Sequence, residues 1–125
     1  EALADKANSA RVLVLGLTFK ENVPDTRNSK VKDVVDALKT KGCEVLIHDP
    51  FYKKEEIESM NGYKAGSLDD GPFDAIAFLV PHKEYLDMGT DKFISLTKDG
   101  GVIYDLKGLL DQNDIKNTGR RYLAL

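Results

Sequence analysis

Five short apolar runs, separated by longer polar or amphipathic stretches, constrain the fold of this chain most strongly. The first run, residues 11–17, is almost continuously apolar, which is typical of a strand buried on both faces of a sheet. Strands that alternate with helical stretches imply right-handed crossovers and a mostly parallel sheet. We therefore predict an α/β fold, a Rossmann-like three-layer sandwich with a mostly parallel sheet of about five strands. The other four runs are residues 45–47, 74–80, 101–104 and 122–125.

The clearest predicted helix lies between the first two runs. Apolar residues recur there at helical spacing and form one stripe, while charged residues cover the remaining surface. The stripe consists of Val31, Val34, Val35 and Leu38. We interpret residues 1–9 as the tail of a connecting helix that begins upstream, which leaves residues 10–125 as the domain. Weaker helices are predicted at 53–60, 91–96 and 111–117, with a short turn at 82–86.

Composition excludes several classes of protein. The 125 residues include 18 basic and 21 acidic side chains, for a net charge of −3, whereas a general nucleic-acid binder is usually basic. No apolar run approaches the length of a membrane span, and the polar start does not resemble a signal peptide. The single cysteine excludes an intrachain disulfide and a multi-cysteine zinc site. We therefore predict a cytoplasmic domain that binds neither nucleic acid nor membrane.

Basic and titratable side chains follow the predicted strands, where open α/β sheets bind their ligands. Lys20, His82, Lys83 and Lys107 each come shortly after an apolar run. Ligands of such sheets bind beyond the carboxyl ends of the strands, at the point where the strand order reverses. Basic groups gathered there in an acidic protein indicate an anionic ligand such as a phosphate. The spacing is equally compatible with ordinary polar loops.

The segment between the first strand and the first helix is unusually long for such a connection. About ten residues separate the two elements, whereas strand-to-helix loops commonly have about 2–6. It contains Phe19, Lys20 and Arg27. Lysine can meet a phosphate as a point charge, arginine can bind one through two hydrogen bonds, and phenylalanine can cover a base or ribose. The alternative is a solvated loop under which Phe19 packs.

Other candidate sites are weak. Gly16 stands alone, without the G-x-G-x-x-G fingerprint, so Asp49 is interpreted as a turn former before Pro50 rather than as a ribose ligand. Cys43 has no base within reach along its strand and is interpreted as a small strand residue. His48 and His82 do not have metal-ligand spacing. We interpret His48 as structural and His82 as either a ligand contact or a helix cap.

The string VLGLTFKENVPDTRNSK at residues 14–30 is the most specific motif of the chain. It resembles the opening of the C-terminal UDP-binding domain in the UDP-glucose/GDP-mannose dehydrogenase family. The short strings at 28–30 and 105–108 are closer to UDP-N-acetylhexosamine 6-dehydrogenases than to UDP-glucose 6-dehydrogenases. Weaker matches follow in the same order: GCEVLIHDP at 42–50, FDAIAFLV at 73–80, PHKEYL at 81–86 and VIYDLKG at 102–108.

The resemblance implies a role within a larger enzyme. Such enzymes oxidise the carbon 6 alcohol of a UDP-sugar to a carboxylate with two NAD, for the synthesis of surface polysaccharides. An N-terminal domain binds most of the NAD, a central helical domain forms a homodimer or larger assembly, and the C-terminal domain binds UDP. The NAD domain and the nucleophilic cysteine lie outside this domain. The chain alone is therefore predicted to be inactive.

The resemblance also assigns roles to individual residues. Phe19 and Lys20 match the pair that contacts the UDP-sugar, and Arg27 matches an arginine that reaches toward the NAD. Lys107 stands where UDP-glucose dehydrogenases have an arginine that contacts the substrate, so the paired hydrogen bonds of arginine are lost. His82 is an additional candidate substrate contact. No catalytic or metal-binding residue is predicted.

Two other functions compete with this interpretation. One is a stand-alone Rossmann-like nucleotide-binding or regulatory module without catalysis. The other is a small complete enzyme, for which the sequence offers no pair of nucleophile and base. Binding of UDP and of NAD separates the first alternative from the dehydrogenase interpretation.

Overall fold

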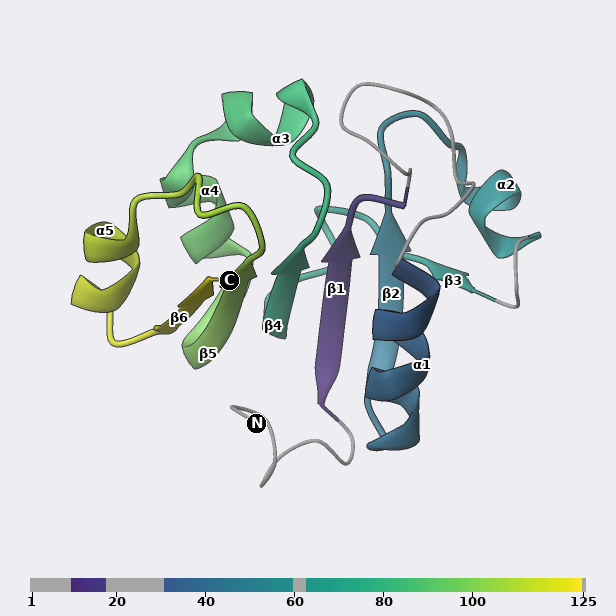
Figure 1. The fold of residues 1–125 in the computed structure, drawn as a ribbon, viewed down its shortest axis with the longest axis horizontal. Helices are drawn as coiled ribbons and strands as arrows, with labels where there is room; N and C mark the ends of the chain where they lie inside the picture. Colours follow the sequence, from purple (N-terminus) through teal and green to yellow (C-terminus); the bar gives the residue numbers. More distant parts are fainter. Residues whose placement is uncertain (1–9, 18–30, 60–62, 125) are drawn as a thin grey trace.

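A six-stranded, entirely parallel sheet forms the centre of the computed structural model, which describes residues 10–17, 31–59 and 63–124 (Figure 1). The strand order is β3-β2-β1-β4-β5-β6, so the first strand of the chain lies in the interior of the sheet. The strands are β1 Arg11–Leu15, β2 Glu44–His48, β3 Lys64–Ala65, β4 Phe73–Phe78, β5 Thr97–Asp105 and β6 Arg121–Ala124. This arrangement confirms the predicted Rossmann-like fold and its parallel sheet.

The sheet has one more strand than the five or so predicted. The additional strand, β3, has only two residues, which is too short for an apolar pattern to indicate it. Strand β5 also begins four residues before its apolar run. The prediction missed this first part because it contains the polar residues Lys98 and Asp99. That part pairs with β4 through a register shift between Phe73 and Ala75.

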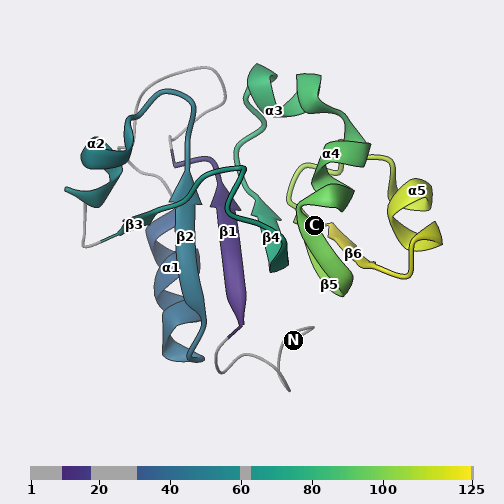
Figure 2. The same ribbon diagram turned by 180° about the vertical axis from the view of Figure 1, so that it is seen from behind.

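Helices cover both faces of the sheet. On one face, Val31 and Val35 of α1 pack with Val12 and Val14 of β1, and α2 adds Ile57. On the other face, α3, α4 and α5 add Tyr85, Phe93 and Ile115 to a second cluster that includes the alternate side chains of β1, and the reverse view shows α4 beside β5 (Figure 2). The helices are α1 Val31–Thr40, α2 Lys54–Glu58, α3 Lys83–Met88, α4 Thr90–Ser95 and α5 Gln112–Asn117.

These helices confirm most of the helical predictions. The stripe of α1 faces the sheet as expected, since Val31 and Val35 are buried and Val34 and Leu38 pack beside them. The short turn predicted at 82–86 is the helix α3. The predicted helical tail at residues 1–9 lies outside the described residues.

Strand β1 is buried from both sides, which explains its nearly continuous apolar run. Leu13, Val14 and Leu15 are fully inaccessible to solvent, with successive side chains directed to opposite faces. Removing one such leucine side chain costs about 2–5 kcal/mol. The carboxyl ends of β1, β2 and β4 all point to the edge where α3 lies, so the residues that follow these strands meet there (Figure 1).

Candidate functional site at the carboxyl edge of the sheet

The strand order reverses between β1 and β4, and the two chain segments that leave these strands lie very close together. A side chain built on Gly16 would place its Cβ only 2.5 Å from Cβ of Val80 and 2.8 Å from its backbone nitrogen. Gly16 also has a positive φ of 106°, and its N–H donates to the carbonyl of His48 at 2.9 Å. Glycine at this position therefore allows the ends of β1, β2 and β4 to meet.

Asp49, directly after β2, accepts hydrogen bonds from three parts of this edge. Its Oδ2 accepts from the backbone N–H of Leu17 at 2.7 Å and lies 3.1 Å from Nε2 of His82. Its Oδ1 accepts from the backbone N–H of Phe51 at 2.8 Å, which confirms the turn predicted at this position. The side chain is fully buried. Sequence reasoning missed its position between the strand ends, for which the only signal was an acidic residue at a strand exit.

The electrostatics of Asp49 favour its charged form. Burial by itself raises the pKa of this carboxyl, but hydrogen bonds from His82, Leu17 and Phe51 outweigh burial and lower the pKa below its ordinary value. A carboxylate in this setting is stable only while its donors stay in place. The network therefore links the charge of Asp49 to the positions of three chain segments.

His82 lies inside the protein rather than on the surface of the edge. Its side chain is fully buried, and its ring packs against the rings of Phe51 and Tyr85, with centroids 4.9 and 5.9 Å away. It stands immediately before α3 but makes no side-chain capping hydrogen bond, so the alternative role as a cap is not observed. Contact between His82 and a substrate stays a prediction.

His48 and Tyr85 form a second polar contact beneath this edge. The Tyr85 hydroxyl donates to the backbone carbonyl of His48 at 2.8 Å, and it lies 2.7 Å from Nδ1 of the same residue. Burial lowers the pKa of His48, an effect that the nearby charge of Asp49 partly offsets. Burial likewise raises the pKa of Tyr85. The structure thus gives His48 the structural position expected of it.

At the end of β5, Asp105 holds the turn that presents Lys107. The Oδ2 atom of this buried carboxylate accepts from the Tyr122 hydroxyl and from the backbone N–H of Leu110, both at 2.8 Å. Burial, and next the bond to Asp105, raises the pKa of Tyr122 to about 12. The other oxygen, Oδ1, is buried without a hydrogen-bond donor. Lys107, two residues later, is exposed.

The predicted site residues are only partly brought together in the described structure. Lys107 lies exposed at the carboxyl edge, as expected, whereas the side chain of His82 is buried in the core. Lys83 donates to Asp87 one helical turn away at 2.7 Å, so its charged group is paired on the surface of α3. Three further predictions, Phe19, Lys20 and Arg27, lie outside the described residues.

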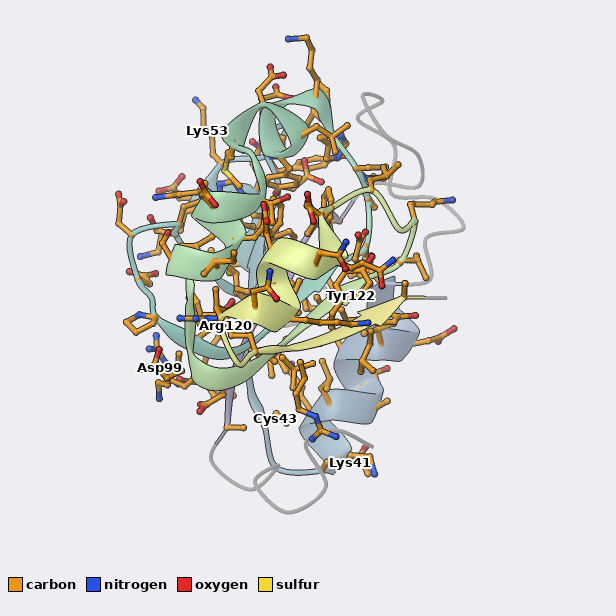
Figure 3. All side chains as sticks on the ribbon, turned by 90° about the vertical axis from the view of Figure 1, so that its left-hand side faces the viewer. Lys41, Cys43, Lys53, Asp99, Arg120 and Tyr122 are labelled. Atoms are coloured by element: carbon orange, nitrogen blue, oxygen red, sulfur yellow. The ribbon has the colours of Figure 1, made fainter. Side chains whose placement is uncertain are left out.

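The described residues show no cluster suited to a metal ion, and the cysteine lies away from this edge. Among residues 10–17, 31–59 and 63–124, no three histidine, cysteine or acidic side chains cluster as a metal site would require. The same part of the chain holds no helix long and apolar enough to cross a membrane. Cys43 is buried just before β2, at the end of the molecule opposite Lys53, which follows β2 (Figure 3). The sequence indicates a small strand residue, and the structure places Cys43 one residue before the strand, in the core.

A family model and individual relatives both match this chain. The model of the UDP-glucose/GDP-mannose dehydrogenase family, UDP binding domain, matches residues 13–112. The UDP-N-acetyl-D-glucosamine 6-dehydrogenase of Pseudomonas aeruginosa is 41% identical over 107 residues, which are 85% of this chain and 25% of that protein. Protein CapL of Staphylococcus aureus is 36% identical over 116 residues, or 92% of this chain and 27% of that protein. The chain thus spans about a quarter of these relatives.

Solved structures agree on the fold. The NDP-N-acetyl-D-galactosaminuronic acid dehydrogenase of Methanosarcina mazei Go1 superposes with a TM-score of 0.79 at 23% sequence identity. The aligned region covers 98% of this chain and 26% of that one. At this identity the likeness concerns the fold alone.

Proposed function

The chain belongs to the UDP-glucose/GDP-mannose dehydrogenase family, where it matches the UDP-binding domain, and from this premise we propose that it binds the UDP part of a UDP-sugar within a larger dehydrogenase. The match over residues 13–112 is the observation that carries the proposal. The larger enzyme oxidises the carbon 6 alcohol of the sugar to a carboxylate for polysaccharide precursors. It works in the cytoplasm as a homodimer or larger assembly.

The names of several relatives favour an N-acetylated sugar as substrate. Proteins of Pseudomonas aeruginosa and Salmonella typhi, 41% and 39% identical to this chain, are named UDP-N-acetyl-D-glucosamine 6-dehydrogenases. A protein of Rhizobium meliloti named UDP-glucose 6-dehydrogenase is 27% identical. We therefore propose a UDP-N-acetylhexosamine as the substrate of the complete enzyme.

The proposed contacts divide between the carboxyl edge and the segment after β1. Lys107, exposed at the end of β5, meets the nucleotide sugar as a single positive charge. Lys20 meets the pyrophosphate, Phe19 contacts the UDP-sugar, and Arg27 reaches toward the cofactor. These three positions rest on the resemblance of residues 14–30 to the family. A contact by His82 requires movement of its buried ring.

NAD, which accepts hydride when bound to such an enzyme, is not held by this chain in the manner of a dinucleotide-binding domain. Gly16 lacks the companion glycines of the fingerprint. The space that a side chain of Gly16 would take is filled by Val80, so this glycine serves contact between strand ends rather than approach to a pyrophosphate. We assign NAD to the enzyme's N-terminal domain, and we expect this chain alone to be inactive.

Titration of the 125-residue chain with UDP and, separately, with NAD tests the proposal. We expect saturable UDP binding by calorimetry, with amide NMR shifts at Lys107, Phe19 and Lys20, and little response to NAD. Lys107→Ala should weaken UDP binding. Lys98→Ala removes the same charge from the opposite end of β5, where Lys98 pairs with Asp74, and should not weaken it. Saturable NAD binding without a UDP response would favour the stand-alone dinucleotide module instead.

A further inference from the structure

A buried hydrogen-bond network joins the chain segments that follow three strands, at the point where the strand order reverses. We call it the Asp49–His82 clamp, and it consists of these two side chains and the backbone N–H groups of Leu17 and Phe51. Leu17 follows β1, Asp49 follows β2, and His82 follows β4. The distances from Asp49 to its three donors are 2.7, 2.8 and 3.1 Å.

The clamp cannot itself be a surface that contacts ligand in this conformation. The side chains of Asp49 and His82 both have no solvent-exposed area. Phe51 covers the His82 ring from one direction, and Tyr85, itself bonded to the His48 carbonyl, lies beside it. The two side chains are therefore held in fixed positions beneath the edge.

The position of the clamp gives it influence over ligand binding. Ligands of open α/β sheets bind in the crevice between the two strands at which the order reverses, here β1 and β4. The clamp's charged oxygen Oδ2 receives donors from both sides of that crevice, through Leu17 and His82. Leu17 is also the residue from which the chain continues toward Lys20. Losing either donor would remove this side-chain link, and the β1 and β4 exits would be joined by the backbone hydrogen bonds from Leu79 and Val80 to the Leu15 carbonyl.

We propose that Asp49 and His82 are positioning residues for UDP, which set the spacing of the β1 and β4 exits without touching the nucleotide. This inference rests on the proposed function, since it takes UDP as the ligand. It replaces the direct contact predicted for His82 with an action through Asp49. Small displacements of groups that contact a ligand carry large penalties, because each contact depends on distance and direction.

Three variants of the clamp test the proposal in the 125-residue chain. His82→Leu removes the donor at similar size, His82→Gln keeps an amide N–H that can reach Asp49, and Asp49→Asn keeps the shape but removes the charge. We expect His82→Leu and Asp49→Asn to weaken UDP binding on the order of tenfold. We expect His82→Gln to restore most of the affinity. Amide hydrogen exchange at Leu17 should quicken in the two weakened variants and stay slow in His82→Gln.

Thr97→Val provides the matched control. Thr97 is as buried as Asp49 and bonds to the Phe93 carbonyl, but it begins β5 at the opposite end of the sheet. Its loss should lower the melting temperature while leaving UDP affinity unchanged. Equal loss of UDP affinity in Thr97→Val and His82→Leu would reduce the clamp to general stability and overturn the proposal.

The remaining outcomes are equally decisive. Unchanged UDP affinity in a folded His82→Leu protein overturns the positioning role but leaves UDP binding by the domain intact. Absence of UDP binding in the unmodified chain overturns the proposed function, and the positioning role with it. If Asp49→Asn fails to fold, the comparison of His82→Leu with His82→Gln decides alone, because those variants keep the carboxylate.

Discussion

Replacing Gly16 by alanine tests whether the stability of this fold depends on the close approach of the β1 and β4 exits. The change adds one methyl group at a residue whose φ is +106°, a value that side chains rarely adopt. The new Cβ would lie 2.5 Å from the Cβ and 2.8 Å from the backbone nitrogen of Val80. Because one of these neighbours is backbone, a side-chain rotation cannot relieve the overlap.

Two costs combine in this variant. A residue held in a sparsely populated backbone region costs about 1–3 kcal/mol. Forcing extra volume into a packed site costs about 1–3 kcal/mol more. We therefore expect the free energy of unfolding to fall by about 2–6 kcal/mol, a large part of the 5–15 kcal/mol typical of a domain. The melting temperature should fall by about 10 °C or more.

Urea unfolding of three glycine variants separates the two costs. Gly100 also has a positive φ, but nothing lies within 4 Å of the Cβ that alanine would add there. The free energy of unfolding of Gly100→Ala should therefore fall by only about 1 kcal/mol. Gly101→Ala meets Thr97 and the Asp74 carbonyl at 2.6 and 2.7 Å without a positive φ. Gly16→Ala should be more destabilised than either. If it loses no more stability than Gly100→Ala, the argument from close approach to Val80 is refuted.

Three further predictions concern the polar groups beneath the carboxyl edge. The lowered pKa of Asp49 contributes stability that is present above the ordinary carboxyl pKa and is lost as the pH falls through the lowered value. The free energy of unfolding, measured from pH 6 to about 2, should therefore depend less on pH in Asp49→Asn than in the unmodified chain. An equal acid dependence in both proteins would contradict the assignment. The NMR titration of His48 should give a pKa below its ordinary value, with stability falling as the pH drops from neutral toward that pKa; a raised pKa would contradict the burial argument. Tyr85→Phe should cost about 1 kcal/mol in urea unfolding through loss of the hydrogen bonds to His48, and an unchanged stability would show that those bonds contribute nothing net.

The sequence predicted the sheet well because burial leaves a strong pattern. Strand β1 is covered on both faces, so its residues had to be apolar without alternation, and α1 had to carry its stripe at helical spacing. The two-residue strand β3 has no room for such a pattern. The start of β5 was missed for a different reason, because Lys98 is exposed there and reads as loop.

The site was less predictable, because its geometry depends on contacts between distant parts of the chain. The exposure of Lys107 follows from its place after a strand. The burial of His82 does not, since it depends on Asp49, which lies 33 positions away in sequence and reads as a simple turn residue. Likewise Asp105 looks like any polar strand end, while its partner Tyr122 belongs to the next strand. Sequence reasoning placed Lys107 at the carboxyl edge of the sheet but did not indicate the network beneath that edge.

The interior position of β1 has a consequence for how this domain folds. Arg11 at the start of that strand bonds to groups 33 and 63 positions later in the chain, in β2 and β4. Every pairing in the described sheet is parallel, so none of its strand pairs can form as a local hairpin. Folding of such a topology is slow, because long loops must close before their contacts stabilise the product. During synthesis β1 leaves the ribosome before β2 and β4, and it cannot complete its pairing until β4 has followed.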